Sequence, residues 1–274
     1  MRVLPNILLA LLACLLSPPA FAVTLTLQGE AVQGGLMFGK ADPGATVQLD
    51  GKALRTSAEG DFAIGFSRDG TGPHELTVTG RDGTREARTI AVTTRSFDIQ
   101  RIDGLPQRQV TPNAEDLARI RAEAAEMTAA RGTVGTQALF RSGFDWPAEG
   151  PISGVYGSQR ILNGEARAPH YGLDIAGAAG TPVRAAAAGT VLFAHPGMYF
   201  NGRTLVIDHG LGVQSIYLHL SEISVQPGTR VEKGQLVGKI GATGRVTGAH
   251  LHWGLQWNDV YVDPLLILPP RSNP

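Results

Sequence analysis

Turn-forming residues interrupt this chain so often that short strands are the elements it can most readily form. The 274 residues include 35 glycines and 17 prolines, many of them in turn signals such as Asp42-Pro43-Gly44. Between these signals lie short runs in which apolar and polar residues alternate. Such alternation is typical of half-buried strands, whereas frequent glycine and proline oppose long helices. The sequence therefore predicts a mainly β protein.

Residues 23–103 are predicted to form a small Ig-like β-sandwich. Short strands at regular spacing, separated by Asp-Gly and Gly-containing turns, favour this architecture. The segment contains one histidine, His74, and no cluster of residues with catalytic potential. We expect a spacer, a binding module or a cover for another site. The predicted strands are Val23–Leu27, Ala45–Leu49, Phe62–Phe66, Glu75–Thr79 and Arg88–Thr93.

A linker, residues 104–137, is predicted to contain one helix over 112–131. Thr111 offers an N-cap and Pro112 suits the first helical position. Gly132 would end the helix. One apolar stripe is expected to face a neighbouring domain, made of Leu117, Ile120, Ala124 and Met127.

Residues 138–270 are predicted to form a second β domain. The strand candidates alternate in the same way and are again bounded by turns. They are Val183–Phe193, Thr204–Asp208, Val213–Leu220, Gln235–Ile240 and His250–Gln256.

Residues 1–22 read as a signal peptide. Arg2 precedes an apolar run of ten residues, and Ala20-Phe21-Ala22 matches a cleavage site. The alternative of a membrane anchor needs a run of roughly 17–25 residues. A second alternative is a lipoprotein, because Leu11–Cys14 resembles a lipobox. Cleavage after Ala22 would leave no cysteine, which suits an oxidising compartment. We therefore expect export, to the periplasm of a Gram-negative bacterium or into the medium, and no transmembrane segment.

Charge and cysteine content exclude several classes of protein. Lysine plus arginine and aspartate plus glutamate each number 24, so the net charge is zero. A nucleic-acid binder would be expected to carry a basic surplus. A single cysteine excludes a disulfide framework and a cysteine-rich zinc module.

The histidines indicate a metal site. His250 and His252 are two apart, so on a strand both face the same way, with Leu251 opposite. His170 and Asp174 lie on a loop that enters a predicted strand. Catalytic zinc takes about three protein ligands and keeps one position open. His170, Asp174 and one of the paired histidines provide such a set.

The remaining member of the pair and His219 would then be free to transfer protons. Each of these short patterns, taken alone, is more often structural than metal-binding. Tyr217 lies two residues before His219 and is predicted to share its strand face. There is no H-E-x-x-H helix, which excludes a zincin.

Seven motifs in order make residues 140–266 similar to the lysostaphin-like, LytM-type zinc metalloendopeptidases of peptidoglycan. The motifs are Gly154–Arg160, Pro169–Ala176, Gly180–Val183, Val206–Gly210, Tyr217–Leu220, Gly241–Trp253 and Val262–Pro264.

The resemblance implies one zinc ion bound by His170, Asp174 and His252, with His219 and His250 as catalytic, non-ligating residues. It also implies an antiparallel β core with the groove across one sheet. The expected activity is hydrolysis of peptidoglycan cross-links. The composition is typical of a Gram-negative bacterium, which favours D-Ala–diaminopimelate bonds over glycine bridges. The alternative is a non-enzymatic LytM-type regulator that binds or activates other hydrolases. As N-terminal segments do in some relatives, the small β domain and the linker helix could cover the groove.

Overall fold

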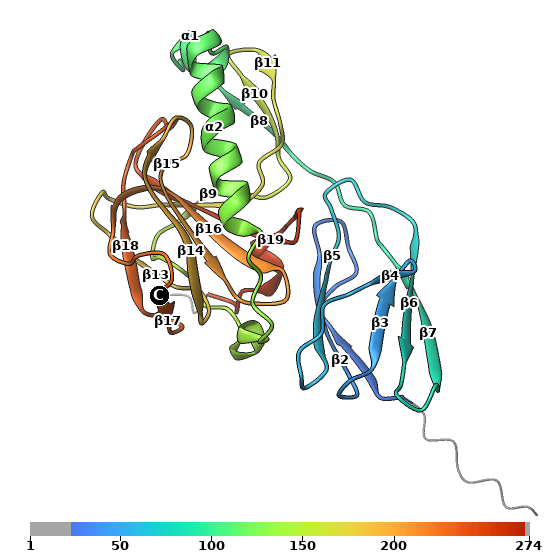
Figure 1. Cartoon of the computed structure of the whole chain (residues 1–274). Helices are drawn as coiled ribbons and strands as arrows, with labels where there is room; N and C mark the ends of the chain where they lie inside the picture. The colour runs from blue at the N-terminus through green and yellow to red at the C-terminus, as the bar shows by residue number, and fades with distance from the viewer. Residues whose placement is uncertain (1–22, 272–274) are drawn as a thin grey trace, which may run out of the picture.

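The computed structural model describes residues 23–271 (Figure 1). The predicted signal peptide and Cys14 lie outside these residues. Within them, no helix combines the length and the apolar character needed to cross a membrane. Strands in antiparallel sheets dominate, so the predicted mainly β fold is confirmed.

The first part of the chain forms two small sheets around a shared core. Alternate side chains such as Val47, Phe62 and Leu76 point between the sheets and are fully buried. Burying each such side chain contributes on the order of 1.5–3 kcal/mol. One sheet consists of β1 (Leu25–Gln28), β2 (Leu36–Ala41) and β5 (Asp61–Gly65). The other consists of β4 (Lys52–Ala53), β3 (Thr46–Leu49), β6 (Pro73–Thr79) and β7 (Arg85–Ala91).

Strand β2 is absent from the sequence prediction because its two faces are both apolar. Met37 packs into the core of the two small sheets. Its neighbours Leu36 and Phe38 point the other way and pack with the core of the C-terminal part. The ring of Phe38 stacks on Phe140 with centroids 4.7 Å apart. A strand buried on both faces shows a continuous apolar run instead of alternation.

The linker is folded onto the C-terminal part. Strand β8 (Ile99–Ile102) pairs in parallel with β10 (Gln159–Leu162), which also pairs with β11 (Glu165–Ala166). A short helix α1 (Gln107–Val110) follows β8. The residues just before the predicted boundary at 103 thus pair with the C-terminal part, not with the small sheets.

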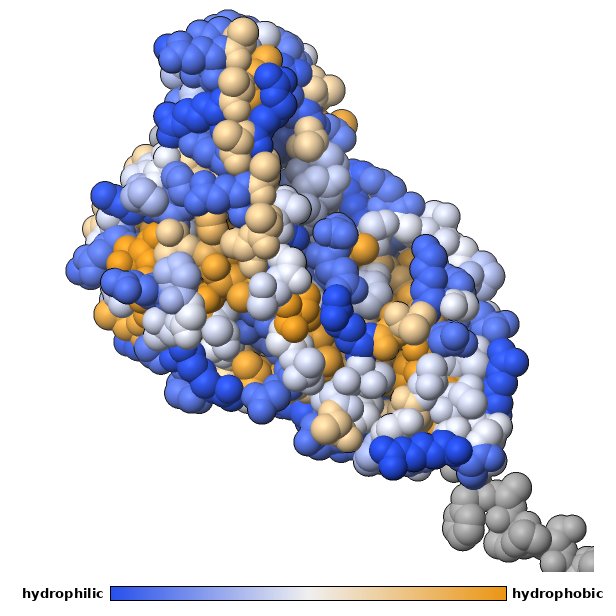
Figure 2. Space-filling view, in the orientation of Figure 1, coloured by the Kyte–Doolittle hydropathy of each residue, from blue (hydrophilic) through white to orange (hydrophobic). Residues whose placement is uncertain are grey.

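The long helix α2 (Ala114–Arg131) starts two residues later than predicted. Its N-cap is Asn113, whose side chain accepts a hydrogen bond from the Asp116 backbone nitrogen, so the prediction of Thr111 was wrong. Asparagine fills this position at least as well as threonine. The helix ends at Gly132, as predicted. Hydrophilic side chains cover much of its outer face, beside a paler stripe (Figure 2).

The C-terminal part is built on one large sheet of ten strands, seven of which follow the order β17-β14-β15-β16-β19-β12-β9. Strand β13 pairs with β18, β18 with β16, and β20 with β19. The bounds are β9 (Ile152–Gly154), β12 (Leu173–Ala176), β13 (Pro182–Arg184), β14 (Gly189–Met198), β15 (Gly202–Asp208), β16 (Val213–Ile223), β17 (Arg230–Val231), β18 (Leu236–Ile240), β19 (His250–Trp257) and β20 (Val260–Val262). Short 3-10 turns occupy Leu139–Ser142 and Pro264–Ile267.

The two faces of this sheet differ in chemistry. Along β19, Leu251, Trp253 and Leu255 are fully buried in the apolar core. The intervening residues face a groove on the other side, and α2 lies against the same side next to β14. Met127 of α2 packs on a small apolar cluster there. The sheet therefore presents one polar strip, bordered by the linker.

Candidate metal centre

Strand pairing places one carboxylate beside one imidazole. Strand β12 runs antiparallel to β19 in a register that puts Asp174 directly opposite His252. Opposed residues of paired strands lie on the same face. Leu173 and Ile175, on either side of the aspartate, enter the core. The alternation of β12 thus turns this carboxylate into the groove.

His170 reaches the same point from the loop before β12. Its backbone nitrogen donates to the Ser158 carbonyl oxygen, and its own carbonyl accepts from the Gly157 nitrogen. The imidazole is fully buried, and its Nδ1 lies 3.0 Å from the Val155 carbonyl oxygen. A carbonyl can only accept, so Nδ1 carries the proton. In the neutral ring Nε2 then offers a lone pair.

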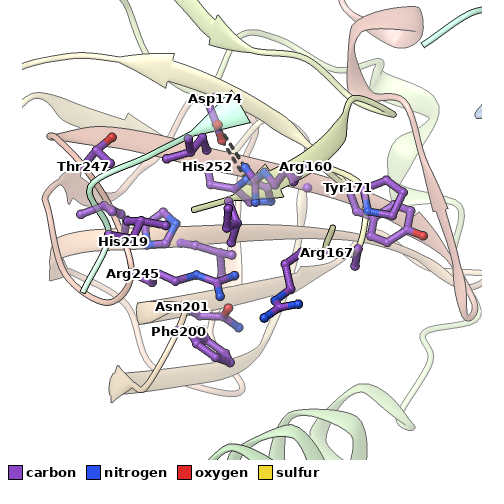
Figure 3. A pocket seen from close by; sticks show the side chains of 18 of the residues that line it. Arg160, Arg167, Tyr171, Asp174, Phe200, Asn201, His219, Arg245, Thr247 and His252 are labelled. Atoms are coloured by element: carbon purple, nitrogen blue, oxygen red, sulfur yellow. Dashed lines mark hydrogen bonds and ion pairs between the residues drawn. The ribbon is translucent and has the colours of Figure 1, made fainter. Parts of the chain in front are cut away.

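Three potential ligand atoms converge. The distances are 3.0 Å from His170 Nε2 to Asp174 Oδ1, 2.9 Å from His170 Nε2 to His252 Nδ1, and 2.9 Å from His252 Nδ1 to Asp174 Oδ1. Figure 3 shows the contact between His252 and Asp174 at the back of the pocket. These three residues form a group that could hold a metal ion.

The protonation of this group favours a cation. Burial raises the pKa of Asp174, but its side-chain contacts with His170 and His252 outweigh burial and hold that pKa well below its usual value. Burial lowers the pKa of His252 to about 4, so this ring is neutral at neutral pH. An ionised carboxylate and a neutral imidazole are the forms of these two residues that bind metal.

Two further histidines lie beside the three. The ring centroids of His219 and His250 are 4.9 Å apart, and that of His219 is 6.2 Å from His252. His250 Nε2 lies 3.8 Å from Asp174 Oδ1. In both rings Nδ1 faces a backbone carbonyl, of Thr243 and of Gly248 respectively, at 2.9 Å. Each Nδ1 therefore donates, and each Nε2 is left to exchange a proton in the groove.

A bulge in β16 directs His219 into the groove. Tyr217 pairs with Leu205 and Leu220 with Arg203, so β16 has one residue more than β15 between these pairs. His219 has φ 65°, a left-handed conformation that is uncommon outside glycine. Bulges redirect side chains next to functional sites. The prediction that Tyr217 shares a face with His219 was therefore wrong. Tyr217 lies in the core, where its hydroxyl accepts from the Ala186 nitrogen.

The other C-terminal histidines lie away from this group. His209 is fully buried and lies between the Ala188 carbonyl and the Ser215 hydroxyl. His195 belongs to β14, where its ring stacks on Phe193.

Four of the five residues, Asp174, His219, His250 and His252, line a cavity of about 610 Å³ whose far wall is the linker, and His170 is buried behind them. Among the described residues, no side chain from 23–98 lines it. Cover by the small sheets stays a prediction. Leu117 and Ile120 of α2 form part of the wall, with Leu105 and Val110 before them. Three arginines that the sequence analysis missed also line it, namely Arg160, Arg167 and Arg245. No short motif contains all three, because they come from three segments.

The sequence profile of Peptidase family M23 matches residues 168–264, which include all five polar residues. The lipoprotein NlpD/LppB homolog of Pseudomonas aeruginosa is 36% identical over 129 residues, 47% of this chain and 41% of that protein. The peptidoglycan DD-endopeptidase ShyA of Vibrio cholerae is 47% identical over 90 residues, 32% of this chain and 20% of that protein. This chain thus matches less than half the length of each of these two curated relatives.

One solved structure matches nearly the whole chain. A crystal structure assigned to peptidase M23 from Pseudomonas aeruginosa superposes with a TM-score of 0.67 at 33% identity. The match covers 87% of this chain and 95% of that one, so it includes the segments that precede the family profile. With the same fold over that length and the profile centred on the polar groove, this chain belongs to peptidase family M23.

Proposed function

We propose that this protein is a zinc-dependent endopeptidase that hydrolyses peptide cross-links of bacterial peptidoglycan. The observation that carries the proposal is the convergence of His170, Asp174 and His252 beside two histidines that are free to move protons. Relatives named as peptidoglycan DD-endopeptidases support the substrate class.

The donor set fits zinc. Zinc prefers nitrogen and oxygen ligands at about 2.0–2.2 Å in tetrahedral geometry, which places ligand atoms about 3.3–3.6 Å apart. The three atoms here are 2.9–3.0 Å apart, so a small outward movement would complete the site. When bound, zinc polarises a carbonyl and lowers the pKa of water. The Val155 carbonyl fixes the ring of His170, as outer contacts commonly do for metal ligands.

We assign the proton transfers to His250 and His219. His250 Nε2 is the base that takes a proton from the attacking water, because it lies on the ligand face, 3.8 Å from Asp174 Oδ1. His219 lies beside it in the same cavity; because its Nδ1 already donates to the Thr243 carbonyl, its Nε2 must take up a proton before it can donate to charge that develops on the scissile carbonyl oxygen. The backbone carbonyls at their Nδ1 atoms keep both rings oriented.

We further propose that the bond cleaved is the D-Ala–diaminopimelate cross-link and that the protein is exported to the periplasm. The relatives named DD-endopeptidases come from a Gram-negative organism, Vibrio cholerae, which supports both points. Mass spectrometry of the muropeptides released from defined sacculi identifies the bond directly.

Metal analysis and digestion of purified sacculi test the proposal. The expected result is one zinc per chain, cleavage that a chelator abolishes, and recovery when zinc is returned. A protein that holds zinc but releases no muropeptides would support the alternative of a regulator of other hydrolases. A protein that holds no metal and is inert would refute the assigned ligands as well.

Replacing Gly154 with alanine should weaken metal binding about 10- to 100-fold, the usual effect of disturbing an outer contact. A Cβ at this position would lie 2.5 Å from Asp174 Oδ2 and 3.1 Å from His170 Cε1. Zinc competition with a chromogenic chelator measures the affinity. Gly197→Ala is the matched control, because its Cβ would meet nothing within 4 Å. Equal affinities in the two variants would contradict the assigned ligands.

A further inference from the structure

Three arginine side chains gather on one side of the groove. Arg160 belongs to β10, Arg167 follows β11, and Arg245 lies in the loop before β19. Figure 3 shows Arg167 and Arg245 extending toward the same space in front of His252. Three cations in one cavity repel each other, so their placement needs an explanation beyond packing.

The linker holds two of these guanidinium groups in place. Arg245 Nη1 donates to the Gln109 carbonyl oxygen at 3.0 Å, and its guanidinium lies 4.2 Å from the centroid of the Phe200 ring. Arg167 Nη2 donates to the Val110 carbonyl oxygen at 3.0 Å. Each contact orients a guanidinium group through one of its nitrogens. The other N–H groups of Arg245 are left available to a ligand.

Only two of the three arginines have a carboxylate nearby. Arg160 Nη2 is 3.5 Å from Asp174 Oδ2, and Arg167 pairs with Glu165. Within residues 23–271 Arg245 has no carboxylate within ion-pair distance. Burial, followed by repulsion from Arg160 and Arg167, lowers the pKa of Arg245 to about 10. A partly buried cation without a counter-ion is unfavourable, so an anion that enters here would relieve the cost.

We propose that Arg245, with Arg160 and Arg167 beside it, binds a free carboxylate of the substrate adjacent to the amide that is cleaved. A guanidinium fork matches a carboxylate with two parallel hydrogen bonds. Asp174 and His252 line the same cavity as the arginines, so one peptide can reach both the metal-binding group and the arginines.

This inference rests on the proposed function and narrows its substrate. In a D-Ala–diaminopimelate cross-link, the nitrogen of the scissile amide is attached to a carbon that also bears a free carboxylate. A glycine bridge carries no such group next to its internal amides. The arginines would therefore select cross-links in which this carboxylate is present and unmodified.

Two synthetic cross-linked peptides test it, one with the free carboxylate on that carbon and one with a carboxamide. The wild-type protein should cleave the carboxamide peptide with a kcat/KM about 10- to 100-fold lower, mainly through KM, because one charge-assisted contact is lost. Arg245→Gln should lower kcat/KM on the carboxylate peptide by a similar factor and no longer distinguish the two peptides. Arg245→Lys should recover part of the preference, since it restores the charge but not the fork.

Arg230→Gln is the matched control, because Arg230 is an exposed residue of β17 outside the groove. It should behave as the wild-type protein does. Zinc content measured in every variant separates an effect on the metal from an effect on the substrate. Equal cleavage of both peptides by the wild-type protein, or an unchanged preference in Arg245→Gln, would overturn the inference.

A binding measurement keeps this test independent of catalysis. Calorimetry with the zinc-loaded His250→Ala protein should show about 10- to 100-fold tighter binding of the carboxylate peptide than of the carboxamide. If the wild-type protein cleaves neither peptide but this preference is present, the proposed activity fails and the carboxylate subsite stands. If binding shows no preference, the subsite fails whatever the activity.

Discussion

The His250→Ala protein is expected to cleave peptidoglycan about 10²- to 10⁴-fold more slowly than the wild-type protein and to keep its zinc. The reason is that His250 lies next to the three ligands without being one of them. Its Nδ1 donates to the Gly248 carbonyl, so only Nε2 can take up a proton in the groove. Removing the ring deletes the base but leaves His170, Asp174 and His252 in place. Kinetics on purified sacculi, with zinc analysis of the same samples, measures both quantities.

Two other variants serve as controls for the His250→Ala protein. His252→Ala should lose zinc and activity together, because it removes a ligand atom 2.9 Å from each of the other two. His195→Ala, in β14 and stacked on Phe193, should retain both. Undiminished activity in His250→Ala, or loss of its zinc, would show that the role assigned to this residue is wrong.

The second large effect concerns stability in acid. His209 is fully buried, and burial lowers its pKa to about 4 in the folded protein, against about 6.5 in the unfolded chain. Between these values the unfolded chain binds more protons, so the free energy of unfolding decreases as the pH falls through this window. The stability that the folded protein owes to a neutral His209 is fully present above about pH 6.5. By pH 4 the free energy of unfolding has decreased by about 3 kcal/mol on this account.

Urea unfolding at several pH values measures how much His209 contributes to the pH dependence of the free energy of unfolding. The His209→Gln protein should lose about 3 kcal/mol less between pH 6.5 and pH 4 than the wild-type protein, whatever its stability at pH 7. If that variant does not fold, nuclear magnetic resonance titration of His209 in the wild-type protein gives the same quantity. Protonation of His209 near pH 6.5 in the folded protein would contradict the prediction.

Local sequence patterns predicted the centre of the site better than its surroundings. The alternation His250-Leu251-His252 requires only that the segment be a strand, and it is one. The opposition of Asp174 and His252 depends on which strands pair, which no local pattern contains. It was accessible only through the resemblance to a known family.

The failures have equally physical causes. Strand β2 is buried on both faces, so it lacks the alternation by which strands are recognised. Because His219 has a left-handed φ, its side chain and that of Tyr217 lie on opposite faces of β16, although they were expected on the same face. The sequence around His219 contains no pattern that predicts such a bulge. The arginines come together from segments up to 85 residues apart, and so they form a cluster in space and none in sequence.

The backbone carbonyls that orient Arg167 and Arg245 belong to Gln109 and Val110, whereas the family profile begins at residue 168. In the proposed carboxylate site, the selectivity of Arg245, which the profile includes, thus depends on residues upstream of it, whereas the metal ligands lie within the profile. Evolution can alter this selectivity by exchanging or lengthening the upstream stretch while the metal ligands stay constant. Two proteins with the same catalytic domain can then differ in the cross-link they attack, and comparison of that domain alone would not reveal it.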